Sequence, residues 1–278
     1  MKRIIICADD YGQNRAISQG IIALLSKNRL SAVSCLTTSP EWSQHAAWLA
    51  AFSNQVDIGL HFNLTEGDAL SDVYRKCYAQ RFFSLPKLLI RAWLRSLNIS
   101  VIEAELSAQL DCFISAMGRL PDFIDGHQHI HQLPQVREAL IGVYHSRFPK
   151  KKGYIRCVND QVMLQDWVQG CGIKKTIIKY FSKKFEYCLA QHNIQHNNYF
   201  SGSYNFSRAN HYAQMFPGFL KAVGDQGLIM CHPGLECHDS SDPIVHARSW
   251  EYAYFSSDAY IADCQTNDVR VSRFFESQ

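Results

Sequence analysis

The sequence predicts an α/β protein in which a mostly parallel sheet closes into a barrel. Short β-prone apolar runs alternate along the chain with segments whose apolar residues recur at helical spacing, which is typical of sheets wound in βαβ units. The chain has 278 residues, a length that favours closure into a (β/α) barrel over an open sheet. Because no linker divides it, we expect one domain over residues 1–278, although the length also allows two small domains.

The strands and helices are assigned from composition and periodicity. Strands are expected at residues 3–8, 32–38, 56–64, 122–124, 154–158, 227–231 and 269–274. Helices are expected at residues 16–26, 42–52, 101–117, 134–146, 173–190, 210–223 and 250–256. In the first helix Ile17, Ile21 and Leu24 share one face, and Pro134 suits the start of the fourth helix. An apolar and basic stretch occupies residues 81–97.

The composition is that of a globular chain. Hydrophobic residues make up 47% and charged residues 19%, which leaves ample apolar surface for a core and argues against a disordered chain. The formal charge is +3, and the densest basic cluster, residues 150–152, is too short for a nucleic-acid surface. We therefore expect no nucleic-acid partner.

The cysteines and the start of the chain indicate a cytoplasmic protein. The ten cysteines include no Cys-x-x-Cys pair, and several lie in apolar runs, which is typical of reduced thiols in a core. The first apolar run is interrupted by Asp9 and Asp10, so we expect no signal peptide. No run of about 18 uncharged apolar residues appears, and we expect no membrane partner.

Residues 125–131 read Asp-Gly-His-Gln-His-Ile-His, directly after an apolar run. If this segment stays extended, Asp125, His127, His129 and His131 share one face, because side chains alternate across a strand. Imidazole and carboxylate together suit zinc or another divalent first-row ion. The alternative is a solvated histidine loop or one hydrogen-bonded core histidine.

Polar residues follow four of the predicted strands: Asp9 and Asp10, His61, the 125–131 segment, and His232. The carboxyl ends of parallel strands meet at one edge of the sheet, where α/β active sites form. The sequence therefore predicts one site built from distant segments, unless these are unrelated polar loop starts. No glycine-rich nucleotide-binding motif follows any strand.

Asp9 and Asp10 are adjacent, and neighbouring residues on a strand point to opposite faces. Both carboxylates reach one site only where the chain turns, and we expect Gly12 to supply that turn. Two neighbouring carboxylates are tolerable if one binds a cation and the other remains free as a base. Alternatively, one of them caps the following helix.

Four short motifs carry a family resemblance: Ala8-Asp9-Asp10-Tyr11-Gly12, Gly59-Leu60-His61-Phe62-Asn63-Leu64-Thr65, Asp125-Gly126-His127-Gln128-His129-Ile130-His131 and His232-Pro233-Gly234. Together they resemble the YdjC-type carbohydrate deacetylases, which include the chitooligosaccharide deacetylases. The motifs span residues 8–234 in the family's order. The resemblance implies a distorted (β/α) TIM-like barrel of the glycoside hydrolase/deacetylase type. It also implies one divalent metal ion, Mg or Zn, and removal of acetyl groups from N-acetylated sugars or oligosaccharides.

Carried over to this chain, the resemblance makes Asp10, His61 and His127 the metal ligands, Asp9 the general base, and His232 an acid or oxyanion partner. On this reading the 125–131 segment supplies one ligand only.

We expect Asp125 and His129 to orient the ligands and His131 to face substrate. Arg156 lies where relatives tend to have an arginine facing the site, the alternative being a surface arginine. Tyr11 replaces the more usual Phe, and residues 160–210 look unlike the relatives, so the sequence leaves the sugar unidentified.

Other functions stay open at this stage. The same barrel could carry another metal-dependent hydrolase such as a phosphoesterase, or a two-His, one-carboxylate iron oxygenase. A carbohydrate-binding relative without catalysis is a third alternative, although all the motif residues are intact. The resemblance also allows a homodimer.

Overall fold

The structure is a computed structural model that describes residues 1–148, 152–159, 172–240 and 242–275. Its strands are β1 (Lys2–Tyr11), β2 (Ala32–Cys35), β3 (Asp57–Phe62), β4 (Phe123–Gly126), β5 (Tyr154–Ile155), β6 (Tyr199–Ser201), β7 (Gly227–Cys231) and β8 (Val269–Val271).

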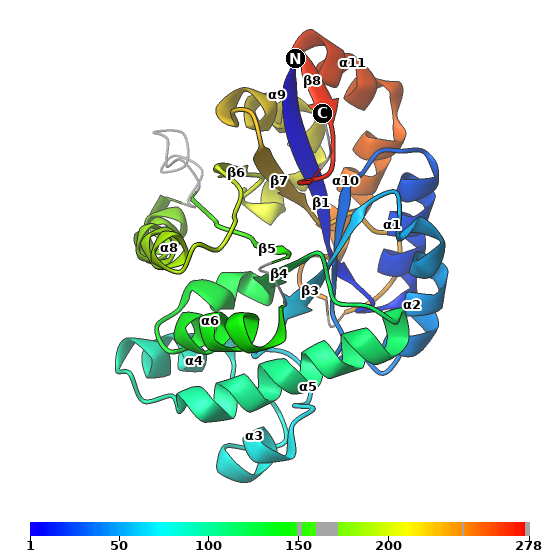
Figure 1. Ribbon diagram of the computed structural model, residues 1–278. Coiled ribbons are helices and arrows are strands. Elements are labelled where there is room, and N and C mark those ends of the chain that lie inside the picture. The colour runs from blue at the N-terminus through cyan, green and yellow to red at the C-terminus, as the bar shows by residue number, and fades with distance from the viewer. Residues whose placement is uncertain (149–151, 160–171, 241, 276–278) are drawn as a thin grey trace.

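Helices surround the sheet (Figure 1). The α-helices are α1 (Arg15–Ser26), α2 (Trp42–Leu49), α3 (Asp72–Cys77), α4 (Leu85–Trp93), α5 (Ile99–Met117), α6 (Val136–Arg147), α8 (Gly172–Gln191), α9 (Tyr212–Ala222), α10 (Val245–Ser256) and α11 (Asp258–Thr266). The described residues also include the 3₁₀ helices η1 (Ala50–Phe52), η2 (His127–Gln132) and η4 (Phe206–His211).

All pairs between these strands are parallel, in the order β5-β4-β3-β2-β1-β7-β6, and β8 runs beside the start of β1. The sheet curls until Ile155 of β5 forms an isolated parallel bridge with His196, shortly before β6. The predicted distorted barrel is confirmed. One sheet includes strands from Lys2 to Val271, which supports a single domain over residues 1–278; that assignment stays a prediction.

Alternating side chains of β1 build two cores. Ile4 and Ile6 pack in the layer between the sheet and the helices, whereas Ile5 and Cys7 belong to a smaller cluster inside the barrel. Asp9 continues the inward-facing series, so its position follows from the strand period of two.

A column of aromatic rings fills the barrel at the start of β4 and β5, the end away from the polar strand ends. Phe123 stacks on Tyr154 at 5.0 Å between ring centroids, and Tyr154 stacks on Phe274 at 4.1 Å. A Cβ atom at Gly59 would lie 2.4 Å from the Phe123 ring. Any larger residue at position 59 would therefore displace the Phe123 ring.

Among the strands and α-helices of the described residues, four short ones were not predicted: β6, α3, α4 and α11. A three-residue strand is too short to show alternation, and α3 depends on the Ser71 side chain, which accepts hydrogen bonds from the amides of Val73 and Tyr74. Helix α4 lies within the apolar and basic stretch at residues 81–97. None of the helices in the described part of the chain is long and apolar enough to cross a membrane.

We expect Gly59→Ala to destabilise the protein by about 1–3 kcal/mol, because the new methyl group must displace the Phe123 ring. The matched control is Gly218→Ala in α9, where a Cβ atom meets nothing within 4 Å and where alanine favours the helix by up to about 1 kcal/mol. Urea denaturation midpoints measure both effects. Equal midpoints for Gly59→Ala and the wild type would contradict the packing argument.

Candidate metal and active site

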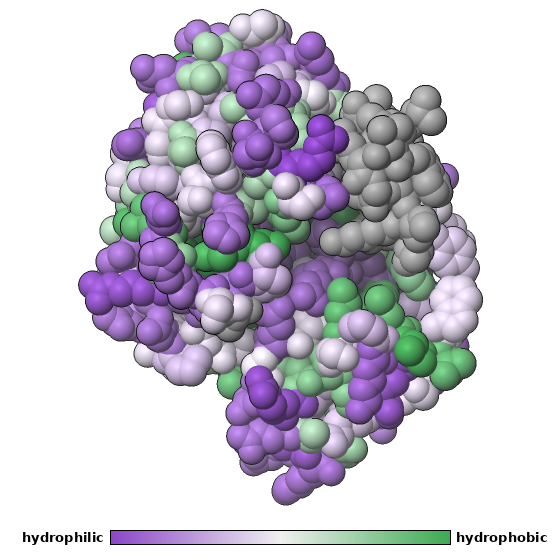
Figure 2. Space-filling model, turned by 180° about the vertical axis from the view of Figure 1, so that it is seen from behind, coloured by the Kyte–Doolittle hydropathy of each residue, from purple (hydrophilic) through white to green (hydrophobic). Residues whose placement is uncertain are grey.

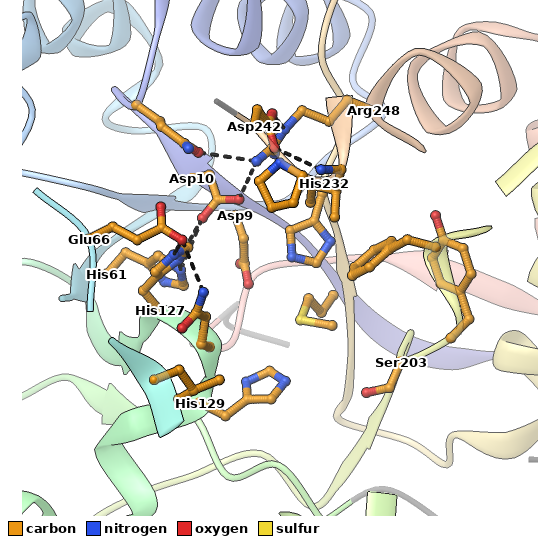
Figure 3. A pocket seen from close by; sticks show the side chains of 18 residues that line it. Asp9, Asp10, His61, Glu66, His127, His129, Ser203, His232, Asp242 and Arg248 are labelled. Carbon is orange, nitrogen blue, oxygen red and sulfur yellow. Dashed lines mark hydrogen bonds and ion pairs between the residues drawn. The ribbon is translucent and has the colours of Figure 1, made fainter. Parts of the chain in front are cut away.

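The candidate site lies where the carboxyl ends of β1, β3, β4 and β7 meet (Figure 3). The structure brings Asp9 and Asp10 from β1, His61 from β3, His127 from the segment after β4, and His232 from the segment after β7 into one pocket. These residues are as many as 223 positions apart in sequence, from Asp9 to His232. The pocket thus unites the four polar strand ends.

Both carboxylates of β1 reach the pocket because a bulge at Asp10 interrupts the alternation of side chains along the strand. Asp10 has φ 65°, and the pairing register between β1 and β2 shifts between Ala8 and Tyr11. Gly12, with φ 94°, continues the turn, but the bulge begins two residues earlier than expected. Asp accepts left-handed backbone better than most residues, which allows the bulge to occur here.

Residues 125–131 do not stay extended, so the condition under which their four polar side chains share one face is not met. Strand β4 ends at Gly126, and η2 begins at His127, with Gln128 (φ 54°) and His129 (φ 62°) in left-handed conformation. A Cβ atom at Gly126 would lie 2.8 Å from Nδ1 of His131, so the chain folds back tightly here. Of the four polar side chains, His127 and His129 line the pocket, whereas Asp125 and His131 do not.

Three donor atoms converge in the pocket. Oδ1 of Asp10 lies 3.0 Å from Nδ1 of His127 and 3.3 Å from Nε2 of His61, and these two nitrogens are 3.3 Å apart. Ligands bound to one ion at roughly 2.0–2.2 Å are separated by roughly 3.0–3.4 Å. The donor set and its spacing therefore fit one divalent metal ion, and all three side chains are buried.

The orientation of His61 is set by Asp125. Nδ1 of His61 lies 2.7 Å from Oδ1 of Asp125, which also accepts a hydrogen bond of 2.6 Å from the Ser34 hydroxyl. With Nδ1–H donated to the carboxylate, Nε2 faces the pocket with its lone pair free. Asp125 therefore lies where the sequence analysis placed it, behind a ligand.

The other two donors are held by residues that the sequence analysis did not identify. Nε2 of His127 lies 3.2 Å from Glu66, which leaves Nδ1 for the pocket. Oδ2 of Asp10 accepts a hydrogen bond of 2.9 Å from Arg248, and Arg248 also donates to Asp242 at 2.5 Å. Each donor side chain thus uses one atom for the pocket and the other for a charged neighbour.

The charges of the cluster are strongly coupled. Burial alone would raise the pKa of Asp10, but Arg248 and His127 hold it well below its usual range. Burial would likewise lower the pKa of both histidines, yet Asp125 and Asp10 raise that of His61 to about 10, and Asp10 raises that of His127 to about 9. These imidazoles must lose protons to bind a metal ion, so binding releases protons.

Arg156 is fully buried, so the alternative of a surface arginine is excluded. Its guanidinium donates to both oxygens of Asp9, at 2.7 and 2.6 Å, and lies 2.6 Å from Asp125 and 2.9 Å from the Cys7 sulfur. Cys7, Asp9 and Asp125 also have metal-ligand spacing, but the guanidinium already supplies the positive charge between them. Burial raises the pKa of the Cys7 thiol well above its usual value.

His232 carries a neutral imidazole at neutral pH. Burial lowers its pKa to about 4, even though Asp10 and Asp9 act in the opposite direction. Its backbone amide donates a hydrogen bond of 2.5 Å to buried Glu251, and its ring packs edge-on against Phe206 at 5.3 Å. The imidazole is thus placed in the pocket by neighbours from α10 and η4.

The other two histidines lie in positions opposite to those expected. His129 lines the pocket and packs against Phe200 at 5.7 Å. His131 does not face substrate: it is fully buried, its Nε2 lies 2.9 Å from the Arg156 carbonyl oxygen, and burial lowers its pKa to about 4. His131 instead ties the folded-back segment to β5 and its continuation.

The pocket has a cavity volume of about 280 Å³ and an aromatic wall. Ser203, Tyr204 and Phe206 form part of that wall, and they belong to the region whose sequence looks unlike the relatives. Residues 160–171 of that region lie outside the described residues.

The sequence offered little sign of the additional charged residues of the pocket. Glu66 directly follows the quoted His61 motif and could have been included with it. Asp242 lies before α10 and Arg248 lies within it, and no sequence spacing connects either residue to Asp10. Only folding brings them within reach of the site.

Comparison with known proteins gives a family match over most of the chain. The family model described as YdjC-like protein matches residues 3–266. A carbohydrate deacetylase of Danio rerio is 34% identical over 165 residues, which cover 56% of this chain and 52% of that protein. A chitooligosaccharide deacetylase of Yersinia enterocolitica is 32% identical over 147 residues, which cover 52% of this chain and 57% of that protein. The chain thus spans about half the length of the curated relatives it matches.

Solved structures share the fold. A proposed cellobiose-phosphate cleavage protein of Enterococcus faecalis superimposes with a TM-score of 0.73 at 18% identity, over 98% of this chain and 97% of that one. A peptidoglycan N-acetylglucosamine deacetylase superimposes with a TM-score of 0.50 at 12% identity, over 98% of this chain and 85% of that one. At these identities the likeness establishes the fold alone.

Alanine at Asp10, His61 or His127 is expected to abolish stoichiometric binding of a divalent metal, because each substitution removes one of three converging donors. Asp9→Asn keeps all three donors and is expected to bind metal as the wild type does. Inductively coupled plasma mass spectrometry after dialysis measures the metal content. Full occupancy in all three alanine variants would rule out this donor set.

Glu251 is expected to make stability decrease with rising pH. Burial raises its pKa from 4.5 to about 7, so the folded state holds a proton that the unfolded state loses above pH 4.5. Its stabilising contribution is therefore complete below about pH 4.5 and is lost as the pH rises through about 7, a change on the order of 3 kcal/mol.

Glu251→Gln mimics the protonated form and should lack this part of the pH dependence. Urea unfolding of wild type and variant between pH 4.5 and 8 measures the difference in unfolding free energy. A difference that stays constant across this range would contradict the raised pKa.

Proposed function

This chain belongs to the YdjC-like protein family, and we propose that it is a metal-dependent hydrolase that removes acetyl groups from N-acetylated sugars or oligosaccharides. The observation that supports this most directly is the Asp10, His61 and His127 donor set beside a second, separately held carboxylate, Asp9. Amide hydrolysis needs both a polarised acyl group and a base for water, and the pocket offers residues for each.

The three donors would hold the metal ion, and a bound divalent ion would polarise the acyl oxygen and lower the pKa of water. Asp9 is the proposed base. It lies in the same pocket, and Arg156 binds both of its oxygens, which keeps the carboxylate in one orientation. In this role Asp9 takes the proton of the attacking water.

His232 is the proposed partner of the acyl oxygen and the leaving amine. A neutral imidazole donates a hydrogen bond, so in its resting state His232 would bind the oxygen on which charge develops. It would act as the acid for the amine only after it receives a proton, because its lowered pKa leaves it unprotonated at neutral pH.

The substrate wall supports a sugar ligand. Tyr204 and Phe206 present aromatic surface to the cavity, and Ser203 and His129 add polar groups. We further propose that the metal ion is magnesium or zinc and that the protein works in the cytoplasm, where its nine described cysteines, all free thiols, remain reduced. A homodimer is proposed from the family resemblance alone.

The purified chain, supplied with Mg²⁺ or Zn²⁺, is expected to release acetate from short N-acetylglucosamine oligomers or related acetylated sugars. A coupled enzymatic acetate assay measures turnover, and chelation with EDTA should abolish it. Asp9→Asn should retain metal but lose at least about 100-fold in kcat, because only the base is removed. Near-normal turnover in that variant would assign the base to another group.

A further inference from the structure

Exposed apolar side chains gather on two neighbouring helices. Of the eleven large hydrophobic side chains exposed among the described residues, three lie on or beside α4 and two on α8. We call this the α4–α8 face, defined by Ile90, Trp93, Leu94, Tyr180 and Tyr187, which are 60%, 65%, 69%, 47% and 66% exposed. The helices are in contact, since Trp93 packs edge-on against Phe181 at 6.3 Å.

The spacing places these residues on one side of each helix. Ile90, Trp93 and Leu94 are three and four residues apart, and Tyr180 and Tyr187 are seven apart. An ordinary surface helix presents mostly charged residues outward, whereas the outward side of α4 also carries large apolar side chains. The α4–α8 face therefore offers apolar surface to a partner.

The charge around the face is positive. Residues 73–102 contain six basic and no acidic residues, and three of the six, Arg75, Arg81 and Arg95, form ion pairs with carboxylates from outside this range. Lys87 and Arg91 of α4 lie over the Phe83 ring, both at 4.9 Å, beside the exposed apolar side chains. On α8, exposed Lys183 and Lys184 lie between the two tyrosines on the same side of the helix. An anionic partner would complement this rim.

The face adjoins the mouth of the pocket. Leu85, the first residue of α4, lines the cavity that contains Asp9 and Asp10. Figure 2 shows hydrophobic side chains gathered beside the hollowed part of the surface. A partner bound to the face would thus lie next to the entrance of the pocket.

We propose that the α4–α8 face docks on the surface of an anionic membrane. Apolar side chains flanked by Lys and Arg, together with Trp and Tyr, are the composition that seats a helix at the lipid headgroup level. A second copy of this chain fits less well, because a two-fold interface would bring like charges together. Surface docking needs no membrane-crossing segment, and it revises the expectation of no membrane partner.

The test uses the full chain and vesicles of phosphatidylcholine with phosphatidylglycerol, compared with phosphatidylcholine alone. Cosedimentation should be at least ~10-fold stronger with the anionic vesicles. Ile90→Ser combined with Leu94→Ser should weaken it at least ~10-fold, since both side chains are mostly exposed and their loss leaves the core intact. Ile261→Ser, an exposed position on α11, is the matched control and should bind as the wild type does.

A second measurement does not depend on the double variant. Brominated lipids should quench tryptophan fluorescence in the wild type and in Trp250→Phe, which removes another half-exposed tryptophan, but much less in Trp93→Phe. Three outcomes would each overturn the proposal. The first is absence of binding to anionic vesicles, and the second is unchanged quenching in Trp93→Phe. The third is a dimer in solution that the Ile90→Ser, Leu94→Ser double variant converts to monomers. Neither measurement uses turnover, so the outcome is independent of the proposed deacetylase activity.

Discussion

The buried guanidinium of Arg156 is the interaction on which the arrangement of the site depends. It joins Asp9 of β1 to Asp125 of β4, and its backbone carbonyl lies 2.9 Å from Nε2 of His131 in the segment that follows β4. Burial alone would lower the pKa of Arg156, but Asp125 and Asp9 raise it well above its ordinary value. Three segments that share no sequence proximity are thereby joined by one charge.

A buried ion pair of this kind contributes to geometry more than to stability, because the desolvation of its charges offsets much of their attraction. Arg156 forms ion pairs with Asp9 and Asp125 and lies between them, while Arg248 binds the outer oxygen of Asp10. Asp10 thus directs Oδ1 toward His61 and His127, and Asp9 remains outside the donor set. The two arginines explain how two adjacent carboxylates can have different environments.

The regular layers of the fold could be predicted, because burial imposes a period on them. The 3.6-residue period in α1 and α5 and the apolar runs of β1 and β7 lie where the sequence placed them. Elements held by a cap or by a few tertiary contacts, such as α3 and β6, carry no such period. For the same reason the path of the histidine segment could not be predicted: β4 ends at Gly126, and two left-handed residues follow in η2.

The sequence by itself determined the composition of the site: the motif residues around Asp10, His61 and His127 mark strand ends, and strand ends meet in a parallel sheet. Only the tertiary structure decided what each neighbour does. Whether His129 or His131 enters the pocket depends on two left-handed residues, and Glu66 and Arg248 reach the donors across long sequence separations. Hydrogen bonds and ion pairs act over a few ångströms in space, and sequence order carries little information about such distances.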